Sequence, residues 1–229
     1  MQRPIGQKGA NMKFAAFLVI ASIAFVAWAG SPVSAGDGRD ISSVNGEVTA
    51  SPGETYGSLS TVNGSVHIGN GVTADRAKTV NGEIDVENSA KLGELSTVNG
   101  SLNIGDDVNI AGTASTVNGS VELGKRSRVG GDVSTVSGEI ELRGAEVGGQ
   151  VHTRNGDIDL SDGARVRGGI HVKKDNNTNW GWGKSHPIKV HICSTCVVDG
   201  ELRFDRPVEL RVDAGAKIGK VIGDSVTRR

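Results

Sequence analysis

Cys193 and Cys196 are the side chains of the sequence with the most reactive chemistry. They form a Cys-x-x-Cys pair, and His186 and His191 precede them. Such a pair can close a disulfide in an oxidising compartment, remain as two thiols, or bind zinc or exchange disulfides. Zinc ligands have tighter spacing, and no thioredoxin-like βαβ pattern surrounds the pair. We therefore expect a structural disulfide, with free thiols and a metal or redox site as alternatives.

Carboxylates and histidines could perform acid and base catalysis if the chain brought them together in pairs. Along this sequence they alternate with apolar residues, which is typical of the solvated face of a strand. We expect no catalytic site, no metal site and no cofactor, and histidines without fixed partners. The acids are Asp85, Glu87, Asp106, Asp107, Glu139, Glu141, Asp157 and Asp159, and the histidines are His67, His152 and His171.

Trp180 and Trp182 stand in a polar stretch without strand alternation. Residues 174–187 are therefore expected to form a loop that leaves the body of the protein. Exposed tryptophans could stack on sugar rings or on a partner protein, and they could equally fold back over apolar surface. If the tryptophans are exposed, the loop is a candidate contact site; if they fold back, it covers the neighbouring segments.

The element that must position these residues is a short repeat. Val-Asn-Gly occurs five times, two degenerate copies follow, and the glycines lie 18, 18, 18, 19, 19 and 18 positions apart. Such a period indicates one unit stacked on copies of itself. We expect the asparagine in a left-handed corner, with its amide bonded to the amides above and below, and the glycine in a second unusual conformation. The corner residues are Asn45, Gly46, Asn63, Gly64, Asn81, Gly82, Asn99, Gly100, Asn118, Gly119, Asn155 and Gly156.

Each unit of 18 or 19 residues holds strand alternation such as Val66-x-Ile68 and is expected to contain three short strands. The fold predicted is an all-β, right-handed parallel β-solenoid of about nine windings, spanning residues 36–229, with the last windings and cap in 188–229. Asn-Gly also favours antiparallel hairpins. A hairpin meander would not place equivalent residues side by side, however, so the repetition favours the solenoid.

The N-terminus predicts export. Arg3, Lys8 and Lys13 precede an apolar run, and Ser31 to Ala35 ends in small residues, so residues 1–35 are expected to be a cleaved signal peptide that leaves no stable membrane span. Cleavage changes the balance of 25 basic against 26 acidic residues to 22 against 26. This mildly acidic chain has no basic cluster, which argues against a nucleic-acid partner.

Two known families resemble parts of the array. Segments such as Val129-Gly130-Gly131-Asp132-Val133 and Glu146-Val147-Gly148-Gly149-Gln150-Val151 are similar to the units of bactofilins, which are polymer-forming bacterial β-solenoids. The Val-Asn-Gly-x-Ile/Val pattern resembles the DUF4097 family of exported adhesin-like β-solenoid domains. The resemblance covers about residues 41–222 and implies a non-catalytic structural or surface protein.

The resulting expectation is an exported protein in the periplasm, on the cell surface or in the medium, with a structural or adhesin-like role at the bacterial envelope. Envelope polysaccharide or envelope proteins are the expected partners, and charged terminal segments favour a monomer or small homo-oligomer. The alternatives are a polymer-forming scaffold and a polysaccharide-binding or polysaccharide-processing β-helix. A further hypothesis is ice binding by an outward rank of threonines, Thr61, Thr79, Thr97, Thr116, Thr135 and Thr153.

Overall fold

The computed structural model describes residues 38–174, 187–223 and 226–228, which lie within one compact unit, Ser34–Arg229. These residues form 26 strands and no helix. Within them, therefore, no helical segment is long and apolar enough to span a membrane. The signal peptide expected over residues 1–35 lies outside the described residues, as do Trp180 and Trp182.

One sheet is built from the first short strand of each winding, which follows the Asn-Gly corner where that corner is present. Its neighbouring strands are parallel and in register, so that Val66 pairs with Ile84 and Val121 with Ile140. The ten strands are β2 (Val48–Ala50), β4 (Val66–Ile68), β6 (Ile84–Val86), β8 (Leu102–Ile104), β11 (Val121–Leu123), β14 (Ile140–Arg143), β17 (Ile158–Ser161), β20 (Ile188–Ile192), β23 (Val208–Val212) and β26 (Val226–Arg228).

The second sheet completes each winding and is also parallel. Its first strands are β1 (Arg39–Ser42), β3 (Thr55–Ser60), β5 (Thr73–Lys78) and β7 (Lys91–Ser96). The rest are β9 (Asn109–Ile110), β10 (Ala114–Ser115), β12 (Arg128–Val129), β13 (Val133–Ser134), β15 (Glu146–Val147), β16 (Val151–Thr153), β18 (Arg165–Val166), β19 (Ile170–Val172), β21 (Val197–Val198), β22 (Leu202–Phe204), β24 (Lys217–Ile218) and β25 (Val221–Ile222).

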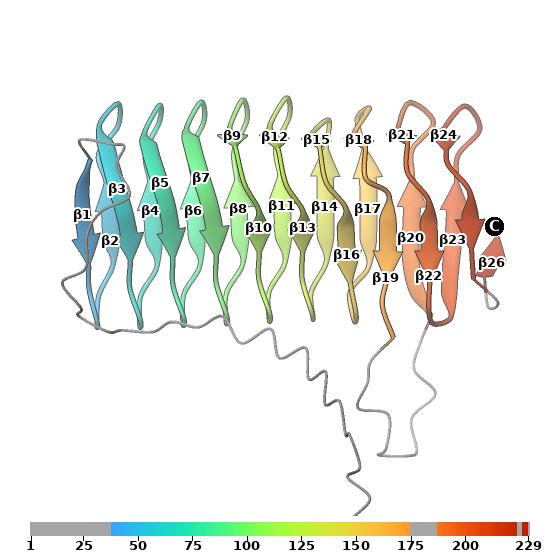
Figure 1. Ribbon diagram of the computed structural model, residues 1–229, viewed down its shortest axis with the longest axis horizontal. Coiled ribbons are helices and arrows are strands. Elements are labelled where there is room, and N and C mark those ends of the chain that lie inside the picture. Colours follow the sequence, from blue (N-terminus) through green and yellow to red (C-terminus); the bar gives the residue numbers. More distant parts are fainter. Residues whose placement is uncertain (1–37, 175–186, 224–225, 229) are drawn as a thin grey trace, which may run out of the picture. The chain divides into compact units, whose positions relative to one another are not determined.

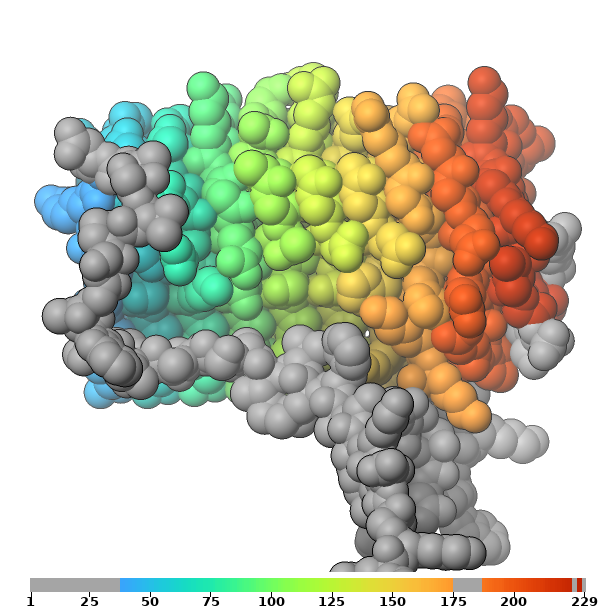
Figure 2. Space-filling view, in the orientation of Figure 1, coloured from blue at the N-terminus to red at the C-terminus, as the bar shows by residue number. Residues whose placement is uncertain are grey.

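The two sheets together make a β-solenoid of about nine windings, as predicted. Figure 1 shows the windings following one another in chain order, with successive strands of each sheet side by side. In the space-filling view the described windings pack against one another in the same order (Figure 2). Because every strand pair in both sheets is parallel, the hairpin meander is excluded.

The expected three strands per winding appear only from the fourth winding onward. In the first three windings the second and third strands are joined into one six-residue strand, β3, β5 or β7. The change coincides with one extra residue: Leu92 and Leu95 are three positions apart, whereas their partners Ile110 and Ala114 are four apart. The additional residue breaks the long strand into β9 and β10 and lengthens the unit from 18 to 19 residues.

The core consists of inward side chains stacked in ranks along the array. Branched aliphatic residues dominate, and side chains such as Leu102, Ile140 and Leu160 are fully buried. Each winding leaves one side of its own core residues uncovered, and the next winding covers it, which removes apolar surface from water. One rank reads Val48, Val66, Ile84, Leu102, Val121, Ile140, Ile158, Val190 and Leu210.

The threonine rank lies inside this core, so the expectation of an outward threonine face was wrong. All six threonines are buried, and the hydroxyl of Thr79 donates to the carbonyl of Gly64 at 2.8 Å. Thr61, Thr97, Thr116 and Thr135 make the same bond to the corner glycine 15 or 16 positions earlier. The corner valines are not part of the buried core: Val62 is partly exposed, and Val44, in the first corner, is 55% exposed. Ice binding by outward threonines is therefore excluded.

The corner glycines are needed because successive windings approach closely there. A Cβ added to Gly100 would lie 1.9 Å from the carbonyl oxygen of Gly82, and one added to Gly119 would lie 2.0 Å from that of Gly100. Both obstacles are backbone atoms, which cannot move without opening the stack. The spacing of Val-Asn-Gly along the sequence thus records a point in each of these windings where a side chain does not fit.

We expect Gly100→Ala to lower the free energy of unfolding by about 3 kcal/mol or more, since the new methyl group must push two windings apart. Gly71→Ala is the matched control, because Gly71 has a φ of 68° but nothing lies within 4 Å of its added Cβ. Its cost should be about 1–2 kcal/mol, from backbone conformation alone. Urea unfolding of both variants would check this, and equal losses would contradict the close-approach explanation.

Candidate functional site

The corner asparagines form a continuous amide ladder. Asn63 Nδ2 donates to Asn45 Oδ1 at 3.0 Å, and Asn81, Asn99 and Asn118 each donate in turn to the preceding asparagine at 2.9 Å. Backbone bridges join the same residues. The expected left-handed conformation is not found, because the non-glycine residues with positive φ are Ser89, Asp107, Arg126 and Asp162, all in other turns. The asparagines are therefore there for the ladder and not for a special backbone conformation.

The continuous ladder ends at Asn118, where the next copy of the repeat is degenerate. Ser137 takes the next asparagine position, and Asn155 follows it. The guanidinium of Arg206 donates to Asn155 Oδ1, and its Nη1 also donates to the carbonyl oxygen of Arg154 at 2.6 Å. Arg206, which belongs to the winding that begins at Ile188, thus bonds to the side-chain amide of the last corner asparagine, Asn155.

The structure joins Cys193 and Cys196 in a disulfide, with 5.1 Å between their Cα atoms. They begin and end the turn between β20 and β21, where the amide of Cys196 donates to the carbonyl of Cys193 at 3.0 Å. The same turn bond recurs between Ser161 and Ala164 and between Asp213 and Ala216. The disulfide therefore ties the two ends of a turn that other windings form without one, which is a structural arrangement.

Most of the acids that were expected to be solvated have partners in neighbouring windings. Asp85 accepts a bond from Asn103 Nδ2 at 2.7 Å, and Asp107 forms an ion pair with Arg126 at 2.6 Å. Arg143 lies between Glu122 and Glu141, at 3.3 and 3.7 Å. The contacts of Asp85, Asp107 and Glu122 join adjacent windings and tie the array together from outside, whereas Glu141 and Arg143 lie on the same strand, β14.

Glu139 directly precedes β14, in an environment that is unfavourable to its negative charge. Burial raises the pKa of Glu139, and the nearby charges of Glu141, Asp157, Asp159 and Glu122 raise it further. Besides this burial, the register contributes, because parallel stacking places acids of successive windings directly beside one another. Negative charge therefore accumulates along the outer face of β11, β14 and β17.

Two of the histidines also have partners, contrary to expectation. His67 Nε2 lies 3.3 Å from Glu87 Oε1, and His171 Nε2 lies 2.7 Å from Asp205 Oδ2. His152 lacks a partner at Nδ1 but does not lie on a solvated face, because this nitrogen is buried and burial lowers the pKa of His152 to about 4. The partners of His67 and His171 are 20 and 34 positions away, so only the register reveals them.

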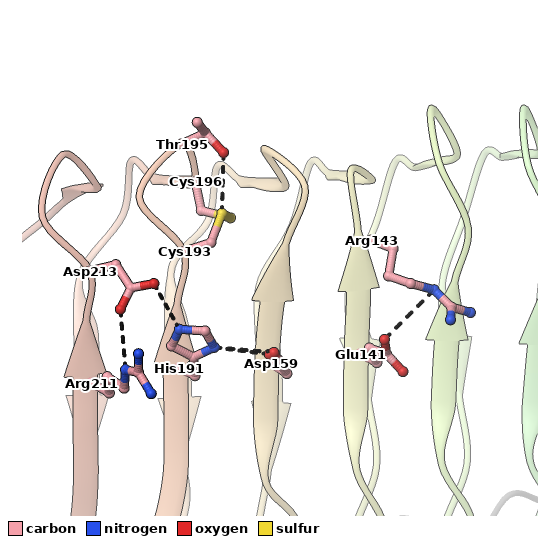
Figure 3. Close-up of polar contacts among 9 residues, drawn as sticks. All are labelled: Glu141, Arg143, Asp159, His191, Cys193, Thr195, Cys196, Arg211 and Asp213. Carbon is pink, nitrogen blue, oxygen red and sulfur yellow. Dashed lines mark hydrogen bonds and ion pairs between the residues drawn. A yellow bond between two sulfur atoms is a disulfide. The ribbon is translucent and has the colours of Figure 1, made fainter.

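His191 bridges two carboxylates from different windings. Its Nδ1 lies 3.1 Å from Asp159 Oδ1, and its Nε2 lies 3.2 Å from Asp213 Oδ2. Figure 3 shows the imidazole between the two aspartates, with Arg211 on the strand next to His191 and bonded to Asp213. Across residues 38–174, 187–223 and 226–228, no group of three or more His, Cys, Asp or Glu side chains is arranged to hold a metal ion.

A groove of about 750 Å³ lies where the Asn-Gly row ends and the chain resumes after the expected loop. It combines carboxylates, an ammonium group, a guanidinium group and an apolar wall. The lining side chains that carry these groups are Glu139, Asp157, Lys189, Arg206, Glu209 and Ile188.

Sequence reasoning singled out Glu139 and Asp157 in this groove but missed Lys189 and Arg206. The sequence did contain a pattern that could have placed Arg206 at the corner. Asp205-Arg206-Pro207 stands where earlier units have their corner tripeptide. The loop residues Trp180 and Trp182 lie outside the described residues. No protein-family model, curated protein or solved structure matches the chain.

We expect Asn99→Ala to destabilise the array more than Asn45→Ala. Asn99 takes part in two amide bonds, with Asn81 and Asn118, whereas Asn45 only accepts one from Asn63. With about 1 kcal/mol for each bond, the central substitution should cost roughly 2 kcal/mol and the terminal one roughly 1 kcal/mol. Thermal unfolding of both variants would measure the difference, and a larger loss for Asn45→Ala would refute the ladder account.

Proposed function

We propose that the chain is exported and acts as a non-catalytic β-solenoid with a structural or adhesin-like role at the bacterial cell envelope. The observation that carries the proposal is the use of the outward side chains. The asparagine ladder and the ion pairs of Arg143 and Arg126 bind each winding to its neighbours. Side chains used in this way stiffen an extended body, which suits a protein that spans distance or presents a surface.

The arrangement of the carboxylates supports a non-catalytic role. Glu141 is paired with Arg143, and Asp159 with His191. Acid and base catalysis requires two groups aimed at a common reacting bond, with protonation states suited to each role. Here both carboxylates point at cationic partners, and the Asp159–His191 pair joins neighbouring windings.

Binding of envelope polysaccharide is the second candidate function, and the groove favours it. Its carboxylates, the ammonium of Lys189 and the guanidinium of Arg206 can donate to and accept from sugar hydroxyls, and Ile188 and Pro187 offer an apolar wall. The periplasm, the cell surface and the medium all bring an exported protein into contact with such polymers, and a monomer or small homo-oligomer would leave the groove open.

Export predicts a mature chain that begins at Gly36. Cell fractionation of the native host or a bacterial expression host, followed by N-terminal sequencing, should find this chain in the envelope or in the medium. Replacing Val33 and Ala35 with glutamate should block cleavage, since signal peptidases require small residues at that site. An uncleaved chain confined to the cytoplasm would show that the proposed location is wrong.

Polysaccharide binding in the groove predicts that Glu139→Gln combined with Lys189→Ala weakens binding about tenfold or more, because hydrogen bonds to charged groups are lost. The control is Glu94→Gln with Lys78→Ala, which makes the same chemical changes at an exposed ion pair of 3.4 Å on the other sheet. A glycan array followed by titration of any hit would measure both. If both variants lose affinity equally, the groove is not the binding site.

A further inference from the structure

The last two windings are attached across an interruption of the repeat. Ile140 and Ile158 are partners 18 positions apart, whereas Ile158 and its next partner Val190 are 32 apart. The strands continue in register beyond this point, with β17 beside β20 and β19 beside β22. Residues 188–223 are therefore joined to the array through a long connection, and their contacts with β17, β18 and β19 must hold them in place.

His191 links three successive windings at this junction. Asp159 lies on β17, His191 on β20, and Asp213 directly after β23. Nδ1 of His191 lies 3.1 and 3.3 Å from the two carboxylate oxygens of Asp159, and Nε2 lies 3.2 Å from Asp213 Oδ2. The imidazole is thus within hydrogen-bond distance of a carboxylate on each side (Figure 3).

The chemistry of the partners determines the charge of the ring. An ionised carboxylate only accepts hydrogen bonds, and a neutral imidazole carries one N–H and one acceptor nitrogen. Both bonds can therefore form together only when both ring nitrogens carry a proton. We infer that His191 is an imidazolium ion in the folded protein and serves as a proton-dependent clamp that holds the last two windings on the array.

The surrounding charges are compatible with this assignment. Arg211 is the neighbour of His191 on β23, and its Nε donates to Asp213 Oδ1 at 3.2 Å, which leaves the second oxygen of Asp213 for His191. Partial burial opposes the charged ring, but the hydrogen bonds to Asp159 and Asp213 outweigh it and raise the pKa of His191. The other charged residues on or beside the packed strands are Glu141, Asp157, Lys189 and Glu209.

A second histidine contact on the other sheet does not depend on the proton in the same way. His171 on β19 reaches Asp205, after β22, through Nε2 alone. A neutral ring with its proton on Nε2 can donate this bond, so it persists when the ring loses its charge. The charged and titratable neighbours of His171 are His152, Arg203 and Lys173. Loss of the proton from His191 therefore loosens one face of the junction and leaves the other joined.

The direction of the pH dependence follows from the raised pKa. Unfolded His191 titrates near 6.5 and the folded residue titrates above this value. The clamp is thus fully effective below about pH 6.5 and is lost as the pH rises through the folded-state pKa. Mildly acidic conditions tighten the last two windings, and alkaline conditions loosen them.

Two measurements on the mature chain test the clamp. The ring-proton signals of His191, followed by NMR against pH, should titrate above 6.5. Hydrogen-exchange protection factors of β20 and β23, corrected for the intrinsic rate, should fall between pH 6 and pH 8.5 relative to those of β4 and β6. The fall should be about tenfold for each unit by which the pKa exceeds 6.5.

Variants test whether His191 is the residue that causes this pH dependence. His191→Gln should abolish the extra pH dependence of β20 and β23, and Asp213→Asn should lower the pKa of His191 toward 6.5. His67→Gln is the matched control, because His67 contacts Glu87 through one nitrogen only and lies far along the array. Titration of wild-type His191 at or below 6.5, or an unchanged pH dependence in His191→Gln, would overturn the inference. If His191→Gln does not fold, the wild-type titration alone decides.

Discussion

The structure depends on the parallel stacking of equivalent residues at the spacing of hydrogen-bonded strands, about 4.8 Å. Every position in a winding has its counterpart directly above and below it, so each residue type is repeated against itself. In the core, stacking places Leu102 between Ile84 and Val121, and these neighbours shield its side chain from water. At the corner it places Asn99 against Asn81 and Asn118, whose amides bond in series. The same spacing excludes any side chain at Gly100.

Charged residues respond to this constraint in two ways. On the sheet that contains β12, β15 and β18, opposite charges alternate, and Glu146 accepts hydrogen bonds from both Arg128 and Arg167. On the other sheet, Glu122, Glu141 and Asp159 stand in one row, where like charges repel. Arg143 and His191 offset this repulsion from neighbouring positions. An acidic row of this kind makes a cationic histidine at its end favourable.

The period and patterning of the sequence were sufficient to predict the parallel array, its number of windings and the interruption near residue 174, because these depend on repetition alone. They were not sufficient to decide which side of the corner faces inward. The threonine rank that includes Thr61 was expected to face outward, since polar side chains are usually exposed. The opposite holds because the hydroxyl of Thr61 finds the carbonyl of Gly46, which satisfies it inside the core. Partners such as Glu87 for His67 depend on exact register and could not be predicted from spacing.

The junction after β19 gathers the features that distinguish this chain from a uniform repeat, and it also bears on assembly. A filament of stacked copies requires that the two ends of the array match, so that the ranks continue from one molecule into the next. Asn45 begins the amide ladder at one end of the described array, but Arg206 takes the asparagine position toward the other end and is already bonded to Asn155. The threonine rank likewise gives way to Val172 and Phe204. The ranks at the two ends of the described array therefore differ in chemistry, and the groove beside Arg206 stands at the point where the repeat stops being uniform.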